Sequence, residues 1–242
     1  MLKDEFKSII DVVPYLTVKA VFLDLDGTIV ELKYRYMDAK AEVFNMLRFN
    51  GVPEYVLNSK LSLYENLENV RNYMENSGEG HMYEKLLNLS FKIAEKYELE
   101  AASNPELLNG AYEALMELRS MNLKLAIVTN NCLKATELTL SKLKIGKFFE
   151  LIVARDHVKT MKPNPDPINY ALLRLNLRGD EVVMVGDSVI DVKAALRAGV
   201  IPVGIASGVA TKEVLAENGA KYVIDYIGGL PSLIKSIDHY SL

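Results

Sequence analysis

Short runs of apolar residues recur along the whole chain, and they constrain its fold more than any other feature. They occupy residues 18–23, 125–128, 151–153, 182–185, 202–205 and 222–224, and the first is interrupted only by Lys19. A run that is apolar at consecutive positions is typical of a strand that is buried on both faces. We therefore predict a sheet whose two faces are both covered.

Between these runs lie stretches with the apolar spacing of amphipathic helices. They cover residues 106–120, 133–143, 167–175, 189–198 and 211–218. Strand and helix alternate, and this order predicts an α/β fold with a parallel sheet flanked by helices.

One segment, residues 33–104, breaks the alternation because it has helical periodicity and no convincing strand. Its apolar stripes are Val43, Phe44 and Leu47; Leu63, Leu67 and Val70; and Leu86, Leu89 and Ile93. Glycine, proline and serine at 51–53 and 77–80 separate the expected helices. We predict two domains, a discontinuous core of residues 1–32 and 105–242 and an inserted helical domain of residues 33–104.

Composition excludes several classes of protein. The 242 residues are 50% hydrophobic and 25% charged, which is typical of a globular protein, and the formal net charge of -4 provides no general attraction for nucleic acid or an anionic membrane. The single cysteine, Cys132, excludes an internal disulfide. Residues 1–11 lack a signal-peptide pattern, and no apolar run is long enough to cross a bilayer. We expect a cytoplasmic protein that is a monomer or a weak homodimer.

Polar residues follow three of the predicted strands. They are Asp24-Leu25-Asp26-Gly27-Thr28, Thr129-Asn130, and Gly186-Asp187-Ser188 with Asp191, and a later loop adds Lys162-Pro163. In an open parallel sheet, the carboxyl ends of neighbouring strands meet at the ligand crevice. An acidic pair before Gly-Thr can be an ordinary turn, but the three strand ends together predict a site.

These motifs, in this order, resemble those of the haloacid dehalogenase superfamily, namely DxDGT, a strand-terminal Thr or Ser, a Lys often followed by Pro, and GDSxxD. The resemblance covers residues 18–28 and 105–234 and implies a Rossmann-like core. The helical insert resembles the C1 cap of subfamily I, as in phosphoglycolate phosphatases. In the first motif, dehalogenases of the superfamily carry DxYGT and transporting ATPases carry DKTGT, so neither has an acid two residues after the nucleophile. The acid at Asp26 therefore favours a phosphatase.

The resemblance implies a role for each matching residue. Asp24 would be the nucleophile that forms an aspartyl phosphate, and Asp26 the acid that protonates the leaving group and later activates water. Thr129 and Lys162 would contact the phosphoryl oxygens. Backbone groups of Gly27, Thr28 and Asn130 would add donors.

A divalent cation is implied by the same motifs. Two carboxylates about 4 Å apart repel by roughly 4 kcal/mol at an effective dielectric constant of about 20, and a phosphate adds to that repulsion. Oxygen ligands beside a phosphate suit Mg²⁺. The resemblance assigns as ligands Asp24, Asp187 and the backbone carbonyl of Asp26, with Ser188 and Asp191 in the outer layer.

The sequence specifies the substrate less well. We expect a small-molecule phosphate ester, because an insert that closes over the site leaves little room. Arg35, at the first connection between core and insert, is the residue whose guanidinium we expect to bind a second anionic group. Two alternatives are a phosphomutase of the same superfamily and a non-catalytic regulatory module with this fold. The hinge lacks the histidine usual in mutases, and all motif residues are present.

Overall fold

The computed structural model describes residues 17–31 and 33–239 of the chain. Within them, six parallel strands form one sheet in the order β3-β2-β1-β4-β5-β6. The strands are β1 (Ala20–Leu23), β2 (Lys124–Val128), β3 (Leu151–Val153), β4 (Val182–Gly186), β5 (Ile201–Ile205) and β6 (Tyr222–Ile224). They coincide with the predicted apolar runs apart from their end residues, and the predicted α/β fold is confirmed.

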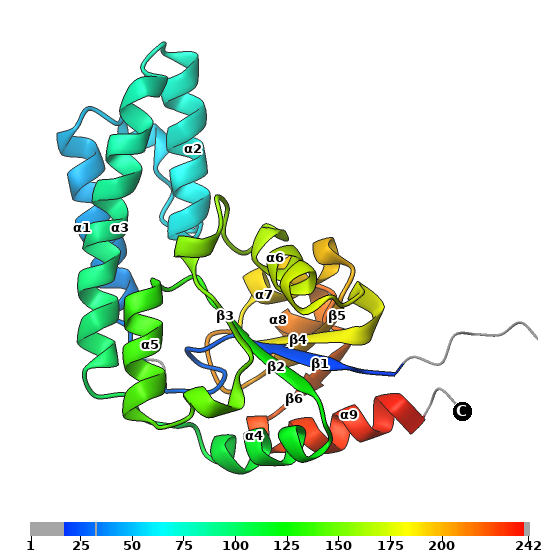
Figure 1. The fold of residues 1–242 in the computed structure, drawn as a ribbon. Helices are drawn as coiled ribbons and strands as arrows, with labels where there is room; N and C mark the ends of the chain where they lie inside the picture. Colours follow the sequence, from blue (N-terminus) through cyan, green and yellow to red (C-terminus); the bar gives the residue numbers. More distant parts are fainter. Residues whose placement is uncertain (1–16, 32, 240–242) are drawn as a thin grey trace, which may run out of the picture.

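Helices cover both faces of this sheet (Figure 1). Val21 and Leu23 of β1 pack into the apolar cluster formed with α4 (Ala111–Ser120) and α9 (Leu230–His239). Phe22 belongs to the opposite cluster, which α6 (Asp166–Leu175) and α7 (Val189–Ala198) complete. Each large apolar side chain buried in this way contributes roughly 1.5–3 kcal/mol. The double burial explains why β1 is apolar at every position.

The remaining core elements are short. Two further helices, α5 (Leu133–Lys142) and α8 (Lys212–Glu217), follow β2 and β5 in the chain. Single turns of 3-10 helix are η1 (Glu54–Val56), η2 (Gly146–Phe148), η3 (Arg155–His157), η4 (Gly179–Glu181) and η5 (Ile227–Gly229). No helix in the described part of the chain is both long and apolar enough to span a membrane.

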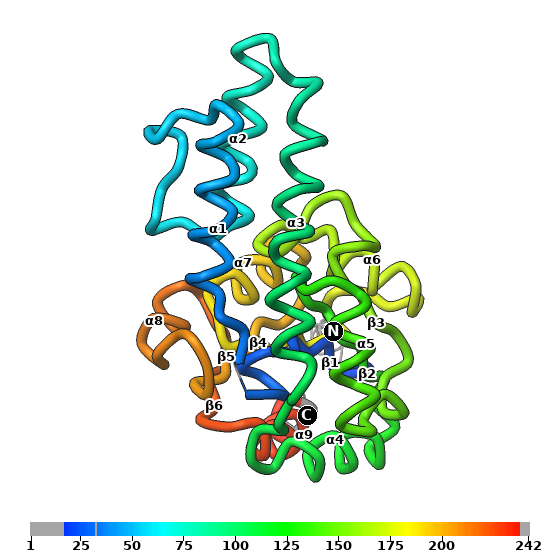
Figure 2. Tube along the Cα trace, turned by 90° about the vertical axis from the view of Figure 1, so that its left-hand side faces the viewer, coloured from blue at the N-terminus to red at the C-terminus, as the bar shows by residue number. Residues whose placement is uncertain are grey.

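Three helices form the insert between β1 and β2: α1 (Tyr36–Phe49), α2 (Leu63–Asn76) and α3 (Gly80–Ala102). They project from one side of the core (Figures 1 and 2). Their facing sides bury a separate apolar cluster that includes Val43, Leu47, Leu67, Val70 and Leu86. The predicted helical insert is therefore present, while the domain boundaries at 32/33 and 104/105 stay a prediction.

The third predicted apolar stripe of the insert coincides only in part with the buried face of α3. The buried residues of α3 include Tyr83, Leu86, Ser90, Ala94 and Tyr97, whereas Leu89 and Ile93 are only partly buried. The helix packs against α1 and α2 and also against α5 of the core. Because of this additional packing against the core, small and polar residues occupy part of the buried face of α3. An apolar stripe in the sequence therefore does not identify the whole buried face.

The helix predicted at 106–120 begins later, at Ala111. Residues 106–108 pair instead with the turn that follows β1, since Glu31 N donates to Glu106 O at 2.9 Å and Leu108 N donates to Ile29 O at 2.9 Å. Gly110 then takes a positive φ of 76° just before the helix. Tertiary pairing thus replaces the first helical turns, and it fixes the point where the insert rejoins the core.

Candidate active site

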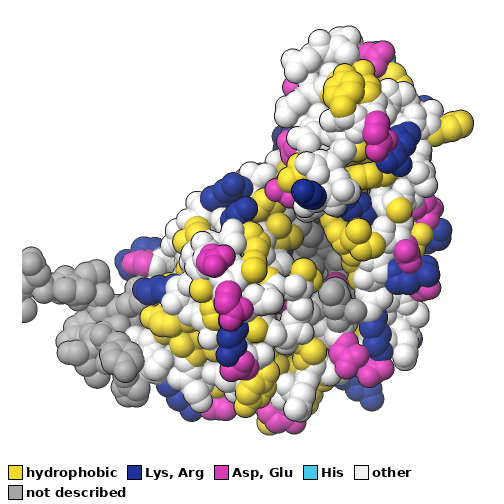
Figure 3. All heavy atoms as spheres, turned by 180° about the vertical axis from the view of Figure 1, so that it is seen from behind, with side chains coloured by type: hydrophobic (Ala, Val, Ile, Leu, Met, Phe, Trp, Pro, Cys, Tyr) yellow, Lys and Arg dark blue, Asp and Glu magenta, His cyan; other side chains and the backbone are white. Residues whose placement is uncertain are grey.

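The predicted site residues converge at the carboxyl ends of three neighbouring strands. Asp24 follows β1, Thr129 follows β2 and Asp187 follows β4, and β1 lies between the other two. After β1 the chain extends the sheet first on one side and later on the other, which is the switch point where open α/β sheets bind ligands. The surface between the insert and the core is hollowed (Figure 3).

Lys162 is the positive centre of the site. Its side chain is 1% exposed, and its Nζ donates to Asp24 Oδ1, Asp191 Oδ1 and Val128 O, each at 2.7 Å. Although burial disfavours the charged amine, Asp191 and Asp24 together raise the pKa of Lys162 above its ordinary value. Lys162 is therefore a fixed cation that separates two carboxylates.

Three carboxylates gather around this lysine. Asp24, Asp187 and Asp191 each offer one oxygen, and the three oxygens lie within 4.8 Å of one another. Burial, opposed by Lys162 and reinforced by Asp191 and Asp187, raises the pKa of Asp24 well above its ordinary value. Burial and the nearby Asp191 raise the pKa of Asp187 to about 7. The cluster therefore carries more negative charge than the one lysine balances.

The free oxygens of this cluster indicate which groups suit a cation. Both oxygens of Asp191 are occupied, Oδ1 by Lys162 and Oδ2 by the Ser188 amide and hydroxyl. Asp187 Oδ2 accepts from Val209 N at 2.7 Å. Within the described residues, Asp24 Oδ2 and Asp187 Oδ1 accept no hydrogen bond from another residue, so these two oxygens fit a hard divalent cation.

Two glycines make room for Asp187. Gly27 has a φ of +75°, and a Cβ atom there would lie 2.3 Å from Asp187 Oδ2. A Cβ atom on Gly208 would lie 1.9 Å from the same oxygen. Any larger residue at either position would displace the carboxylate, which explains the glycine in the motif after Asp26.

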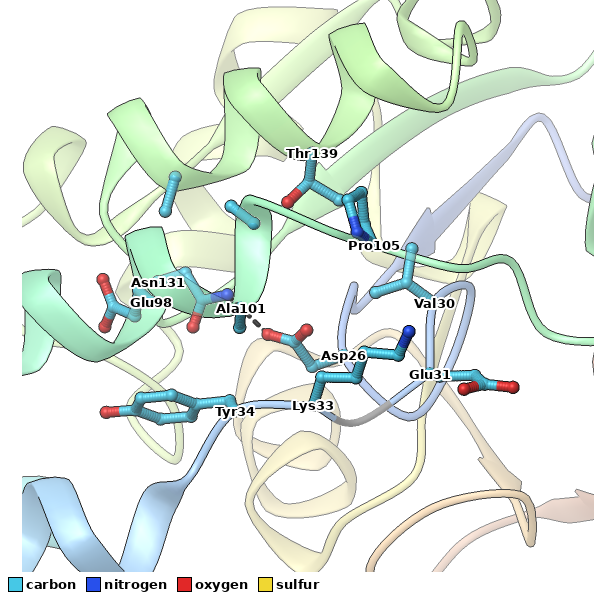
Figure 4. Close-up of a pocket in the computed structure, with 12 residues that line it drawn as sticks. Asp26, Val30, Glu31, Lys33, Tyr34, Glu98, Ala101, Pro105, Asn131 and Thr139 are labelled. Carbon is cyan, nitrogen blue, oxygen red and sulfur yellow. Dashed lines mark hydrogen bonds between the residues drawn. The ribbon is translucent and has the colours of Figure 1, made fainter.

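Asp26 lies beside the cluster and has its own partner. Asn131 Nδ2 donates to Asp26 Oδ2 at 2.5 Å, and Figure 4 shows the two side chains pointing toward each other. Burial raises the pKa of Asp26 to about 6 against the opposing effect of Asn131. The carboxyl also lines a small cavity with Tyr34 and Glu98. Asp26 is thus a partly buried acid that can hold a proton near neutral pH.

Thr129 and Asn130 have different tasks. The Thr129 side chain is almost fully buried, and its Oγ1 accepts from Asn131 N at 3.2 Å, which leaves the hydroxyl proton available for donation. Asn130 Oδ1 accepts from Lys162 N at 3.0 Å, and Asn130 Nδ2 donates to Lys162 O at 2.8 Å. The Asn130 amide therefore holds the main chain of Lys162.

The turn after Asp24 uses the backbone groups of Gly27 and Thr28 internally. Gly27 N donates to Val30 O at 2.8 Å and Thr28 N to Leu25 O at 3.4 Å, and the Thr28 side chain is fully buried. Both backbone amides therefore have acceptors within the turn, whereas Thr28 Oγ1 is buried and has no hydrogen-bond partner within the described residues, and a contact of either residue with substrate stays a prediction. Within the described residues, the amides of Leu25 and Asp26 have no acceptor, so they remain available.

Arg35 lies away from the aspartate cluster. Its guanidinium pairs with Glu100 at 3.1 Å and Asp38 at 3.6 Å and lies 5.2 Å from the centre of the Tyr97 ring. Its side chain is 56% exposed. A role of Arg35 in substrate binding stays a prediction, and it would require the guanidinium to leave these partners.

Sequence reasoning missed several contacts at the site. Asn131 has no predicted role, although it directly follows the Thr129-Asn130 motif and contacts Asp26. Glu98 and Arg155 form a buried ion pair that no local sequence pattern indicates. Tyr36 at the hinge accepts from Leu63 N at 2.6 Å and so caps α2. The sequence indicates the buried position of Glu98 only by its spacing, since this charged residue stands among the buried positions of α3.

Comparisons with known proteins agree with this geometry. A family model described as haloacid dehalogenase-like hydrolase matches residues 21–205. The chain is 27% identical over 224 residues to pyrophosphatase PpaX of Bacillus velezensis, covering 88% of this chain and 94% of that protein. It is 29% identical over 227 residues to phosphoglycolate phosphatase of Neisseria meningitidis, covering 91% and 94%.

A solved structure supports the same assignment. The crystal structure of a hydrolase from Pseudomonas syringae is 25% identical, has a TM-score of 0.67, and matches 90% of this chain and 99% of its own. The similarity therefore extends over the core and the insert together. The chain belongs to the haloacid dehalogenase-like hydrolases, and phosphatases of that family are its relatives over most of its length.

Proposed function

We propose that this protein is a Mg²⁺-dependent phosphatase that hydrolyses a small-molecule phosphate monoester through a phospho-aspartate on Asp24. One observation carries the proposal: the Asp24 carboxylate lies 2.7 Å from the buried Lys162 amine, within a cluster of three aspartates. The direct test is phosphate release from a panel of esters with Mg²⁺ and with EDTA. Absence of Mg²⁺-dependent release from every ester would reject the proposal.

The first half-reaction forms the aspartyl phosphate. An oxygen of Asp24 attacks phosphorus, the bond from phosphorus to the ester oxygen breaks, and Asp26 gives its proton to that oxygen. The Thr129 hydroxyl and the amides of Leu25 and Asp26 would donate to the phosphoryl oxygens, and Lys162, whose three protons are already donated, would stabilise their charge electrostatically.

The second half-reaction releases phosphate. Asp26, now ionised, takes a proton from water while the water oxygen bonds to phosphorus, and the bond from phosphorus to Asp24 breaks. Both residues return to their starting protonation states.

Asp24 and Asp187 would hold the magnesium ion through their unoccupied oxygens, with the Asp26 carbonyl as a further ligand. A bound Mg²⁺ neutralises phosphate charge and screens the repulsion between substrate and carboxylates. Asp191 would act from outside, since Lys162 and Ser188 occupy its oxygens. We propose in addition that residues 33–104 form a cap that excludes water and restricts the substrate to small esters.

Replacement of Asp26 by Asn is expected to slow the hydrolysis of alkyl phosphates far more than that of p-nitrophenyl phosphate. The nitrophenolate leaves without a proton, whereas an alkoxide needs one from the acid. General acid catalysis contributes about 100- to 10,000-fold, so kcat for an alkyl ester should fall by about 100-fold or more. Steady-state kinetics on both esters checks this, and equal losses would argue that Asp26 is structural.

Magnesium is expected to stabilise the fold more at pH 8 than at pH 5. The raised pKa values of Asp26, about 6, and Asp187, about 7, mean that ionising these groups costs stability. In EDTA the free energy of unfolding should therefore decrease as the pH rises from about 4 to about 7. At a Mg²⁺ concentration of about 100 times Kd, the gain at pH 8 should be about 2.7 kcal/mol, or about 5–10 °C in Tm.

Thermal denaturation with EDTA and with Mg²⁺ measures that shift at each pH. Asp187→Asn provides the internal comparison, because it removes a proposed ligand and should lose most of the shift. An equal Mg²⁺ effect at both pH values, or an undiminished one in this variant, would contradict the proposed metal site.

A further inference from the structure

A buried ion pair joins the insert to the core next to the active site. Glu98 lies on α3 and Arg155 begins η3, and their side chains are only 3% and 6% exposed. Arg155 Nη1 donates to Glu98 Oε1, and Arg155 Nη2 donates to Phe91 O at 3.3 Å. Removing one member of such a pair leaves an uncompensated buried charge. The pair therefore fixes the position of α3 against the core.

The same two residues hold the loop that follows β2. Glu98 Oε2 accepts from Cys132 N at 3.0 Å, and Arg155 Nη1 also donates to Asn130 O at 3.3 Å. The backbone amide of Arg155 donates to Asn131 O at 3.1 Å. The two side chains thus hold Asn130 and Cys132, and the Arg155 main chain holds Asn131 between them, so the path of this loop depends on the docking of α3.

Asn131 transmits that placement to Asp26. Its main chain is held by Arg155, and its side-chain amide donates to Asp26 Oδ2 at 2.5 Å. Because Oδ2 accepts this bond, Oδ1 is the Asp26 oxygen that is left to carry a proton to a leaving group. Figure 4 shows Asn131 and Glu98 on the same side of Asp26.

We propose that Asn131 is a positioning residue for Asp26 and that the Glu98–Arg155 pair, by anchoring the loop, links this positioning to the insert. The proposal rests on the proposed role of Asp26 as general acid.

The test compares an alkyl phosphate with p-nitrophenyl phosphate in variants of the full-length protein. Asn131→Ala should lower kcat for the alkyl ester by about 10- to 100-fold, which corresponds to loss of a hydrogen bond to a charged group. The loss on p-nitrophenyl phosphate should be several times smaller, and KM should change little. Glu98→Gln should show the same selectivity with a smaller loss of kcat for the alkyl ester. Arg155→Lys keeps the charge, so its kcat should lie between that of Glu98→Gln and that of the wild type.

Glu42→Gln is the matched control. Glu42 pairs with Lys96 of α3 at 3.1 Å, but this contact lies within the insert and touches no core residue. Circular dichroism and Tm identify variants that fail to fold. If Glu98→Gln is one of them, Asn131→Ala and Arg155→Lys decide the matter, since Asn131 carries no charge and Arg155→Lys keeps a cation beside Glu98.

The outcomes separate this proposal from the one on which it rests. If Asp26→Asn selectively slows the alkyl ester and Asn131→Ala slows both esters equally, or acts through KM, the positioning proposal is wrong and the phosphatase mechanism stands. If Asp26→Asn shows no selectivity, the role of Asp26 is wrong and the positioning proposal fails with it. Selectivity in Glu42→Gln equal to that in Glu98→Gln would also overturn the link to the core.

Discussion

Replacement of Asp24 by Asn is expected to reduce phosphatase turnover by about 1,000-fold or more without loss of the fold. An amide is a poor nucleophile and a weaker metal ligand, so both proposed roles of Asp24 are lost. The fold should persist, because Lys162 keeps its contact with Asp191 and one of three crowded carboxylates becomes neutral. Tm in EDTA should therefore be unchanged or higher. Steady-state kinetics and thermal denaturation measure the two effects.

Covalent labelling tests the same prediction independently. Wild-type protein quenched in acid during turnover should carry one phosphoryl group, located on Asp24 by mass spectrometry, and the variant should carry none. The exposed Asp180, which pairs with Arg178, provides a control whose replacement by Asn should affect neither result. Turnover of the Asp24 variant within about tenfold of the wild type would remove this residue from the centre of the mechanism.

Replacement of Lys162 by Met is expected to have the largest effect on stability. The change leaves Asp24 and Asp191 without the cation that lies 2.7 Å from each. Breaking a buried ion pair by removing one partner costs about 3–5 kcal/mol. The free energy of unfolding in EDTA should fall by that amount at pH 8, and turnover should be lost as well. Urea denaturation measures the stability of the variant.

Lys19→Met is the comparison for this experiment. Lys19 also pairs with a carboxylate, Glu181, at 2.7 Å, but its side chain is 56% exposed. Surface pairs contribute little, so the control should unfold almost like the wild type. Equal effects of the two substitutions would show that Lys162 is not the buried counter-charge of the cluster. Partial recovery of the Lys162 variant at low pH is expected, because protonation removes the repulsion.

The core of the fold was predictable because its signals are local. Strands buried on both faces must be apolar at every position, and Phe22 and Val21 of β1 show why, since they enter opposite clusters. The start of α4 was not predictable. Residues 106–108 have helical character, but they pair with the turn after β1, and only the folded chain brings these segments together.

The candidate site was predictable only where its residues follow strands, because that signal is also local. The residues at strand ends could be placed, because parallel strands bring their carboxyl ends to one edge. The hydrogen-bond and ion-pair partners of the site residues could not be placed from the sequence. Asn131 contacts Asp26 across 105 sequence positions, and Arg35 meets Glu100 across 65. Each contact joins residues that only the folded chain brings together, the first within the core and the second within the insert, and no local pattern records it.

The position of β1 in the sheet has a consequence for the synthesis of this chain. It is the first strand of the described residues to leave the ribosome, yet it occupies the middle of the sheet, where Ala20 pairs with Lys124 on one side and Val182 on the other. Until β2 is made, this fully apolar strand has two unpaired edges, and until β4 is made it keeps one; such edges promote aggregation. The three insert helices are complete before either partner appears, and their separate apolar cluster can form from local contacts. Nascent chains that end before β4 are therefore the ones with most need of a chaperone.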